Sequence, residues 1–452
     1  MSCNKISSIT GTSLVIANMI GTGVFTSLGF QLVDISHTAV ILLLWIVGGV
    51  MALAGAFSYA ELGTAIKRSG GEYTFLTKTF NPLIGYLSGW ISLSVGFAAP
   101  IALSTIALTE YLPISIVNPR LLGLILIFGI TLIHSVNLGV SSKFQNITTL
   151  LKVLLILLIV TLGVVLPAGA ENALSFESSV ISEVKSTAFA VSLIYVSYSY
   201  SGWNAAAYIT GEFKNPAKSL PVALVAGTLI VTVLYTLLQF VFIKHAPYQD
   251  LVGQLNVGTI AIEHMLDVKY SRIFSGAISF LLISGISAMV WVGPRVTSCL
   301  SEDHHLWHFF KNNKKGIPVK ALWFQAILSS LLLITGTFDQ ILVYCGILLN
   351  ISALLAVIGT FRLRMRNDLG ESWISNMDVD VNSQRNQLSM NKNFKSPLFP
   401  LFQIIFISMS VWIITFSIVN KPLETMIGAG NIVIGLFTYY ASNRIKRRKR
   451  SR

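Results

Sequence analysis

The sequence has 452 residues, of which 53% are hydrophobic and only 11% are charged. Soluble globular domains carry about 25% charged residues, so this composition argues against a soluble enzyme or binding module and indicates a chain folded in lipid. The formal net charge of +13 would suit a nucleic-acid partner. The positions of the cations, described below, point to a membrane lipid surface instead and not to nucleic acid.

About twelve long apolar stretches follow one another along the chain, and each is close to the roughly 20 residues that cross a bilayer as a helix. They do not alternate in polarity as transmembrane β-strands do, so the expected fold class is all-α, a polytopic membrane protein. The shortest are 121–138 and 320–336. The predicted spans are 8–32, 39–66, 82–109, 121–138, 147–167, 186–211, 220–243, 273–300, 320–336, 339–363, 398–419 and 424–443.

The positive charges predict the orientation of these spans. With both termini in the cytoplasm, about 26 of the Lys and Arg residues fall inside and about six fall outside, as the positive-inside rule requires. The reverse orientation would export nearly every cation. The basic run at residues 443–452 is then expected to anchor the topology beside anionic lipid.

The same topology indicates a plasma membrane. The predicted external segments 168–185 and 245–272 carry no Asn-x-Ser/Thr acceptor site, which suits a bacterial inner membrane. The first apolar stretch is too long for the core of a cleaved signal peptide. The three cysteines (Cys3, Cys299 and Cys345) fall near the cytoplasmic side or inside spans, so free thiols are expected.

The whole chain, residues 1–452, is expected to form a single membrane transport domain. Its longest hydrophilic interruption, 364–396, is rich in Asn, Ser and charge and is predicted to be a mobile cytoplasmic loop. The segment 245–272 contains VGTIAIEHML, which predicts a short amphipathic helix along the outer surface.

Two spans are interrupted by glycine near their middles. The first span carries Ile20, Gly21, Thr22 and Gly23, and the sixth carries the run 198–202, Tyr-Ser-Tyr-Ser-Gly. The two interruptions match if spans 1–5 and 6–10 form inverted halves, because five is an odd number of crossings. Matched broken helices in inverted repeats are the sequence signature of a transporter's binding site. The predicted repeats are 8–168 and 186–363, followed by two extra helices over 397–444.

The broken helices suggest what the site binds. Open backbone at mid-membrane survives only where it lines a cavity or binds a ligand. The free amides around Gly21, Thr22 and Gly23 suit a carboxylate, and the carbonyls near Ile20, together with those near Tyr198 and Ser201, suit an ammonium. A zwitterionic amino acid carries both groups. The alternative is that the glycines only allow close helix packing.

Several motifs together resemble the amino acid–polyamine–organocation (APC) superfamily, specifically its amino acid permeases. They are NMIGTGVF at 18–25, SGWN at 201–204 continuing to GEFKNP at 211–216, YAELGTAIKRSGGEY at 59–73 and GPR at 293–295. The resemblance covers about residues 8–363. It implies an inverted five-plus-five fold with broken helices 1 and 6, and alternating access around a central site.

The resemblance also implies roles for single residues. The segment from Gly21 to Gly23 would hold the substrate carboxylate, and Tyr198 would be an aromatic gate over the substrate. Gly202 and Asn204 belong to the same substrate-binding set, and Asn204 stands where an arginine-exchanging relative has an acid. Lys152 resembles a lysine that occupies a sodium position between spans 1, 5 and 8. These features favour a neutral amino acid carried without sodium, by exchange or by proton coupling.

Other readings stay open. A permease for polyamines or another organic cation would need no carboxylate site at the first break, and a permease for cationic amino acids is a further alternative. A membrane-embedded enzyme would need catalytic groups in the spans, which offer only an isolated His134, and a channel would need a repeated pore loop. No catalytic residue, cofactor or metal is expected. The partners expected are a small-molecule amino acid and membrane lipid, and a homodimer is possible.

The acidic residues near the cytoplasmic ends are expected to serve structure. Glu61, Glu72 and Glu212 are predicted to pair with Lys67, Arg68 or Lys214 and not with substrate, since no acidic residue lies near either break in the sequence. Apart from Glu302 and Asp303, no Cys or acidic residue lies at metal-binding spacing from the histidines at 304, 305 and 308, so a metal site is not expected there.

Overall fold

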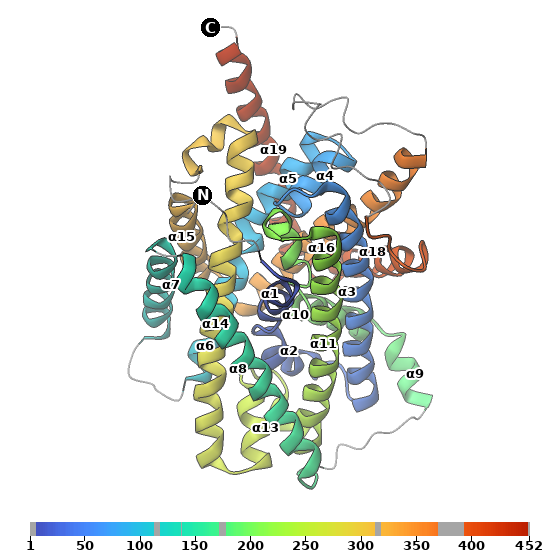
Figure 1. Cartoon of the computed structure of the whole chain (residues 1–452). Helices are drawn as coiled ribbons and strands as arrows, with labels where there is room; N and C mark the ends of the chain where they lie inside the picture. The colour runs from blue at the N-terminus through green and yellow to red at the C-terminus, as the bar shows by residue number, and fades with distance from the viewer. Residues whose placement is uncertain are drawn as a thin grey trace.

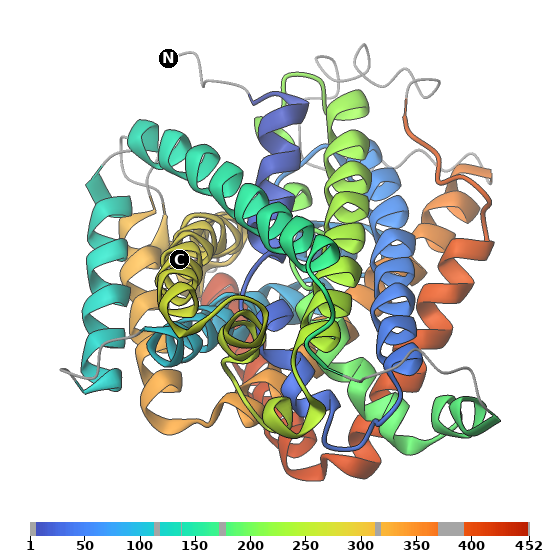
Figure 2. The same cartoon turned by 90° about the horizontal axis from the view of Figure 1, so that it is seen from below.

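The computed structural model describes residues 6–112, 118–136, 138–170, 178–311, 318–368 and 393–450. Regular structure in these residues is helical, apart from one isolated bridge between Ile6 and Phe213. The helices form a bundle in which the long α3, α8, α11 and α14 run past the short, broken ones (Figures 1 and 2).

The first predicted half contains a broken helix, a long helix and a short connecting helix before the remaining spans. Its elements are α1 (Ser8–Met19), α2 (Gly23–Gln31), α3 (Thr38–Ile66), α4 (Glu72–Thr79), α5 (Pro82–Ile91), η1 (Ser92–Gly96), α6 (Ala98–Tyr111), α7 (Pro119–Val136) and α8 (Leu138–Val165).

The second predicted half begins after the short α9 (Ser178–Val184), and two further helices follow it. The elements are α10 (Thr187–Ser199), η2 (Ala205–Glu212), α11 (Pro216–His245), α12 (Tyr248–Leu251), α13 (Val257–Met265), α14 (Val268–Asp303), η3 (His305–Phe310), α15 (Val319–Thr335), α16 (Phe338–Asp368), α18 (Leu401–Asn420) and α19 (Pro422–Arg450).

Nine segments among the described residues are long and apolar enough to cross a membrane, and α10 and α15 are shorter apolar helices. The polytopic all-α fold is therefore confirmed, while the count of twelve spans stays a prediction. The helix expected within 245–272 is present as α13. The expectation of a loop from residue 364 is wrong at its start, because α16 continues to Asp368. Residues 369–392, like Cys3, lie outside the described residues.

The central helices approach closely where one of them carries glycine. A Cβ at Gly49 of α3 would lie 2.2 Å from Thr232 of α11, and one at Gly227 of α11 would lie 2.8 Å from Val15 of α1. Small residues allow such backbone approach where lipid supplies no hydrophobic drive. α11 therefore packs against both α1 and α3, which fixes the first break against a long, continuous helix.

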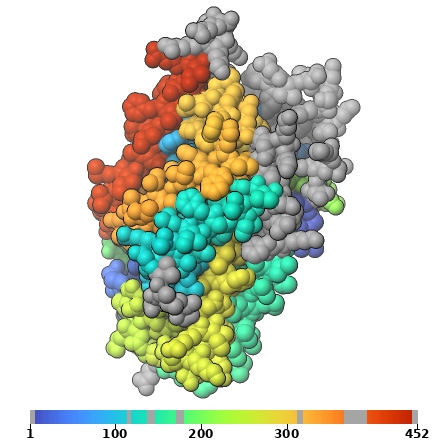
Figure 3. Space-filling view, turned by 90° about the vertical axis from the view of Figure 1, so that its left-hand side faces the viewer, coloured from blue at the N-terminus to red at the C-terminus, as the bar shows by residue number. Residues whose placement is uncertain are grey.

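The helices at the flank present apolar side chains outward. Leu121, Ile125 and Leu132 of α7 are each more than half exposed, as expected for a surface that lipid would cover. α7, α15 and α19 share one flank of the molecule (Figure 3).

The third span contains a π-helical turn, η1, between α5 and α6. Pro100 has no backbone N–H, so the carbonyl of Gly96 receives no α-helical bond from it. A π-turn is a common adjustment at functional sites. Gly96, Phe97 and Pro100 all line the central pocket described below.

Candidate substrate site

The first break lies where the sequence predicts it. α1 ends at Met19, Ile20 leaves helical geometry at φ −71° and ψ 83°, and α2 begins at Gly23. The Gly21 amide donates back to the Met19 carbonyl at 2.7 Å. Because α2 starts a new helix, its first amides have no partner within the helix and form its positive end.

Side chains of the protein cover the carbonyl end of α1. The Lys152 ammonium, on α8, donates to the Ile20 carbonyl at 2.8 Å and to the Ala17 carbonyl at 3.3 Å. The Tyr235 hydroxyl, on α11, donates to the Met19 carbonyl. Lys152 is 1% exposed, and its ammonium lies 3.4 Å from the Cβ position of Gly285 on α14. Lys152 thus joins α8 to α1 beside α14, and it already occupies the Ile20 carbonyl that the sequence offered to a substrate ammonium.

The second break spans residues 200–204, between the end of α10 at Ser199 and the start of η2 at Ala205. Gly202 has φ +98°, a region that other residues rarely adopt. A Cβ at this position would also lie 2.8 Å from the carbonyl of Asn18 on α1. Glycine is therefore required twice, by its own backbone and by the close passage of α1.

The two broken helices touch beside the breaks. A Cβ at Gly23 would lie 2.5 Å from the Ser199 hydroxyl, and the Ser27 and Ser199 hydroxyls are 2.8 Å apart. The phenol of Tyr198 interacts with the side chain of Thr22. In contrast, a Cβ at Gly21 would meet only the Met19 carbonyl, at 3.9 Å. Open space therefore lies beside Gly21, while Gly23 is a packing contact.

A pocket lies beside the second break, between α1, α3, η1, α14 and α16. Four predicted site residues line it: Tyr198, Ser201, Gly202 and Asn204. The other four predicted ligands, Ile20, Gly21, Thr22 and Gly23, lie at the first break and are not among its lining residues.

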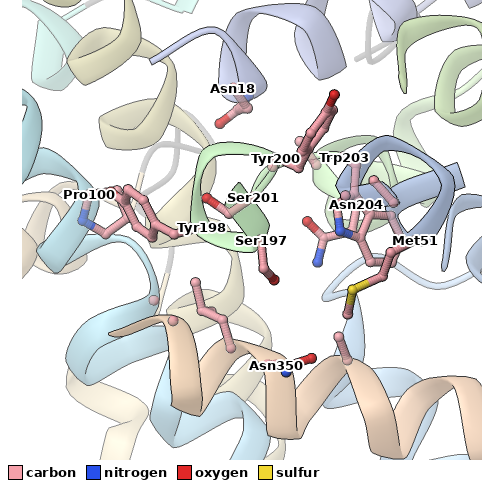
Figure 4. Close-up of a pocket in the computed structure, with 18 of the residues that line it drawn as sticks. Asn18, Met51, Pro100, Ser197, Tyr198, Tyr200, Ser201, Trp203, Asn204 and Asn350 are labelled. Carbon is pink, nitrogen blue, oxygen red and sulfur yellow. The ribbon is translucent and has the colours of Figure 1, made fainter. Parts of the chain in front are cut away.

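Sequence reasoning missed two amides that line the pocket. Asn18 and Asn350 approach it from opposite sides, with the second break between them (Figure 4). The Asn18 Nδ2 donates to the Leu14 carbonyl at 2.8 Å, which leaves its amide oxygen directed into the pocket (Figure 4). A polar residue just before the glycine break was the available signal for Asn18. Asn350 lies within a long apolar run and has no comparable signal.

One acidic side chain lies directly behind the pocket, which corrects the expectation that no acid is near a break. Glu72 of α4 is 3% exposed, and its Oε1 accepts from the Asn204 Nδ2 at 2.5 Å and from the Tyr59 hydroxyl at 2.8 Å. Its Oε2 is buried with no partner among the described residues. Glu72 forms no ion pair with any of the residues that the structure describes.

The other two acids form ion pairs, but not with the predicted partners. Glu61 accepts two hydrogen bonds from the guanidinium of Arg364, at 2.7 and 2.8 Å. Glu212 of η2 accepts from Arg295 of α14 at 2.7 Å. Hydrogen bonds between an arginine guanidinium and a carboxylate are strong and fix the relative orientation of the two planar groups. Glu212 and Arg295 therefore tie the helix after the second break to α14.

The predicted cation Arg68 pairs instead with Asp303, at 2.9 Å. Tyr73 donates to the same carboxylate at 2.6 Å, and burial together with the charge of Asp303 raises the pKa of Tyr73. Among the described residues, no group of three or more His, Cys, Asp or Glu side chains is placed to hold a metal ion. His305 and His308 contact each other through their Nδ1 atoms at 3.1 Å.

Known proteins provide an independent comparison. The family model for amino acid permeases matches residues 6–439. The chain is 26% identical to the b(0,+)-type amino acid transporter 1 of Mus musculus, over 96% of this chain and 88% of the relative. It is 27% identical to the human cystine/glutamate transporter, over 96% and 84%. It is 25% identical to the large neutral amino acids transporter small subunit 2 of Rattus norvegicus, over 96% and 80%.

Two broken helices that meet beside a pocket with polar side chains, in a bundle of apolar helices, are features of a multi-pass membrane transporter. The chain belongs to the amino acid permease family, within the APC superfamily that its motifs resemble.

Proposed function

We propose that the protein is a secondary active transporter that carries α-amino acids by alternating access. The family and the relatives support amino acid transport. The observation that carries the proposal is the meeting of two broken helices, one presenting the first amides of α2 at Thr22 and Gly23 and the other lining a pocket with polar side chains. The amides suit a carboxylate, since they form the positive end of α2.

The ammonium of the substrate would bind to oxygen acceptors of the pocket. Because Lys152 occupies the Ile20 carbonyl, the acceptors proposed are the amide oxygen of Asn18 and the oxygens of Ser201. Tyr198 would cover the substrate, as the resemblance implies. A neutral side chain is favoured because Glu72 stands behind Asn204 and Tyr208 and does not itself line the pocket.

Transport is proposed to be independent of sodium. The Lys152 ammonium donates to two carbonyls freed at the end of α1 and lies beside α14. Those carbonyls are the ligand type that a sodium ion would use. A cation fixed there leaves exchange of amino acids or proton-coupled uptake as the modes of transport.

The proposed arrangement in the membrane keeps both termini in the cytoplasm of a bacterium, with inverted repeats over 8–168 and 186–363. The helices over 397–444 are extra to the repeats and are one candidate surface for a homodimer. The orientation is tested by labelling single cysteines placed near each terminus with a thiol reagent that cannot cross the membrane, in intact and in permeabilised cells. Labelling in intact cells would contradict it.

The test of function is uptake of a panel of radiolabelled amino acids into proteoliposomes, either empty or preloaded, with and without sodium or a proton gradient. We expect uptake of a neutral amino acid that ignores sodium. Uptake that needs internal substrate would define an exchanger, and uptake driven by acid outside would define proton coupling. No uptake of any amino acid would overturn the proposal.

A second candidate, a permease for polyamines or cationic amino acids, is favoured by one observation. The Glu72 carboxylate is buried near the pocket without a cation partner among the described residues. Burying an unpaired charge is costly, so a cationic substrate would gain from it. Competition by amines that lack a carboxylate detects a polyamine permease, because the amides at the start of α2 need a carboxylate, and uptake of arginine or lysine in the amino-acid panel detects a permease for cationic amino acids.

A further inference from the structure

Glu72 contacts a pocket residue that comes from a distant part of the chain. Asn204 follows it by 132 positions, yet the Asn204 Nδ2 lies 2.5 Å from Glu72 Oε1. Tyr59 donates to the same oxygen at 2.8 Å, and Tyr208 also interacts with the Glu72 side chain. Glu72 is therefore the centre of a small polar cluster between α3, α4 and the second break.

The backbone next to Glu72 holds this cluster in place. The Gly70 amide donates to the Tyr208 carbonyl at 2.9 Å. Gly71 has φ +54°, and a Cβ there would lie 2.4 Å from the Tyr208 ring. The start of α4 thus packs directly against η2, and only glycine permits this approach. The position of the Glu72 carboxylate is fixed by backbone contacts and not by its side chain alone.

The chemistry of a carboxylate determines which way the Asn204 amide is turned. An ionised carboxylate only accepts hydrogen bonds, whereas an amide has a donor end and an acceptor end. The donor end, Nδ2, must therefore face Glu72 Oε1, since two oxygens this close would repel each other. The acceptor end, Oδ1, has no partner among the described residues. Figure 4 shows the Asn204 side chain reaching into the pocket.

We propose that Glu72 is a positioning residue that makes the pocket select amino acids whose side chain carries a hydrogen-bond donor. Glu72 holds the Asn204 amide by its nitrogen and so presents the amide oxygen to the substrate. A hydroxyl or amide side chain can donate to that oxygen, and an apolar side chain of the same size cannot. This inference rests on the proposed function and names the substrate class of the same site.

The experiment compares pairs of amino acids that differ by one hydroxyl: serine with alanine, and threonine with valine. KM values are measured for uptake into proteoliposomes. In the wild-type protein we expect the hydroxyl member to have a KM lower by about three- to tenfold, the effect of one hydrogen bond. Wild-type uptake of alanine is the separate check of the proposed function, so failure of either idea is recognisable.

Three variants then test the role of Glu72. Glu72→Met removes the acceptor, and Glu72→Asp withdraws the carboxylate by one methylene; both should bring the KM ratios close to one while alanine is still carried. Glu72→Gln keeps an acceptor oxygen and should keep the ratios. Tyr59→Phe is the matched control, because it removes another donor to Glu72 and leaves the contact with Asn204 intact.

The ratio distinguishes positioning from a structural role. If uptake of all four amino acids falls in parallel at constant KM ratios, Glu72 only supports the fold and the inference is wrong. Unchanged ratios in both the Met and the Asp variants would also overturn it. If Glu72→Met does not insert into the membrane, Glu72→Asp decides, since it retains the charge. A wild-type protein with equal KM values for serine and alanine would refute the inference directly.

Discussion

The two helix breaks have opposite surroundings. At the first break, the carbonyls of Ala17, Met19 and Ile20 are taken by side chains of α8 and α11. At the second break, Ser201, Gly202 and Asn204 face the pocket. The carbonyls of the first break are therefore bonded within the protein, whereas the second break is open to a ligand. Backbone polar groups inside a membrane must be satisfied, and the two breaks meet this need by different partners.

The difference shows which end of a broken helix is available for recognition. The carbonyl end of α1 is covered by Lys152 and Tyr235, but open space lies beside Gly21, just before the amide end of α2. The first break can therefore contribute donors, and the second break contributes acceptors such as Ser201. A zwitterion needs one of each.

The largest expected effect comes from placing a side chain at Gly202, where the second break passes close to α1. Gly202→Ala would force a side chain into φ +98°, at a cost of about 1–2 kcal/mol, and would push a Cβ to 2.8 Å from the Asn18 carbonyl. We expect uptake to be lost and the melting temperature of the purified protein to fall.

The matched control is Gly253→Ala. Gly253 has φ +73°, but nothing lies within 4 Å of its Cβ position, so this variant carries backbone strain without the clash. It should retain uptake. If Gly202→Ala transports as well as Gly253→Ala, the close approach of Gly202 to α1 is not needed for transport and the prediction is wrong.

Removing the cation from the first break should have the next largest effect. Lys152→Met keeps an unbranched side chain that is one atom shorter, but it leaves the Ile20 and Ala17 carbonyls without these donors, at about 1–3 kcal/mol for each. We expect uptake to fall at least about tenfold. Measuring the variant with and without sodium shows whether an ion can replace the ammonium. Normal uptake without sodium would contradict the proposed role of Lys152.

The smallest effects separate the two glycines that flank Thr22. Gly23→Ala should lower thermal stability, because its methyl group would lie 2.5 Å from Ser199. Gly21→Ala should leave stability within about 0.5–1 kcal/mol but raise KM, because its methyl group would enter the space offered to the carboxylate. Melting temperatures and KM values of both variants provide the measurement. Equal KM values for wild type and Gly21→Ala would show that the substrate carboxylate does not bind beside Gly21.

Much of the fold could be predicted because lipid imposes long apolar runs. The predicted 39–66 and 82–109 agree with α3 and with the α5–η1–α6 segment to within two residues at each end. The apolar pattern could not reveal the π-turn at Ser92–Gly96 or the helical extension to Asp368. Both depend on local backbone bonding or on neighbours, which hydrophobicity does not record.

The candidate site was predictable where glycine marks it and not elsewhere. Gly21 and Gly202 identify the two breaks directly. The sequence predicts a cytoplasmic ion pair for Glu72, because its distance from Asn204 along the chain hides a 2.5 Å contact. The sequence also could not show that Gly23 faces Ser199 while Gly21 faces open space. Such differences arise from how α2 and α10 pack.

The cation at the end of α1 also bears on the energy supply of the protein. A dissociable ion moves down its own gradient, and each charge is worth about 2.3 kcal/mol per 100 mV of membrane potential. The Lys152 ammonium is attached to α8 and cannot cross or be exchanged with the solution. In its proposed role it takes the place of such an ion without supplying its driving force. With no other coupled ion, the concentrations of amino acids on the two sides would alone set the direction of net transport.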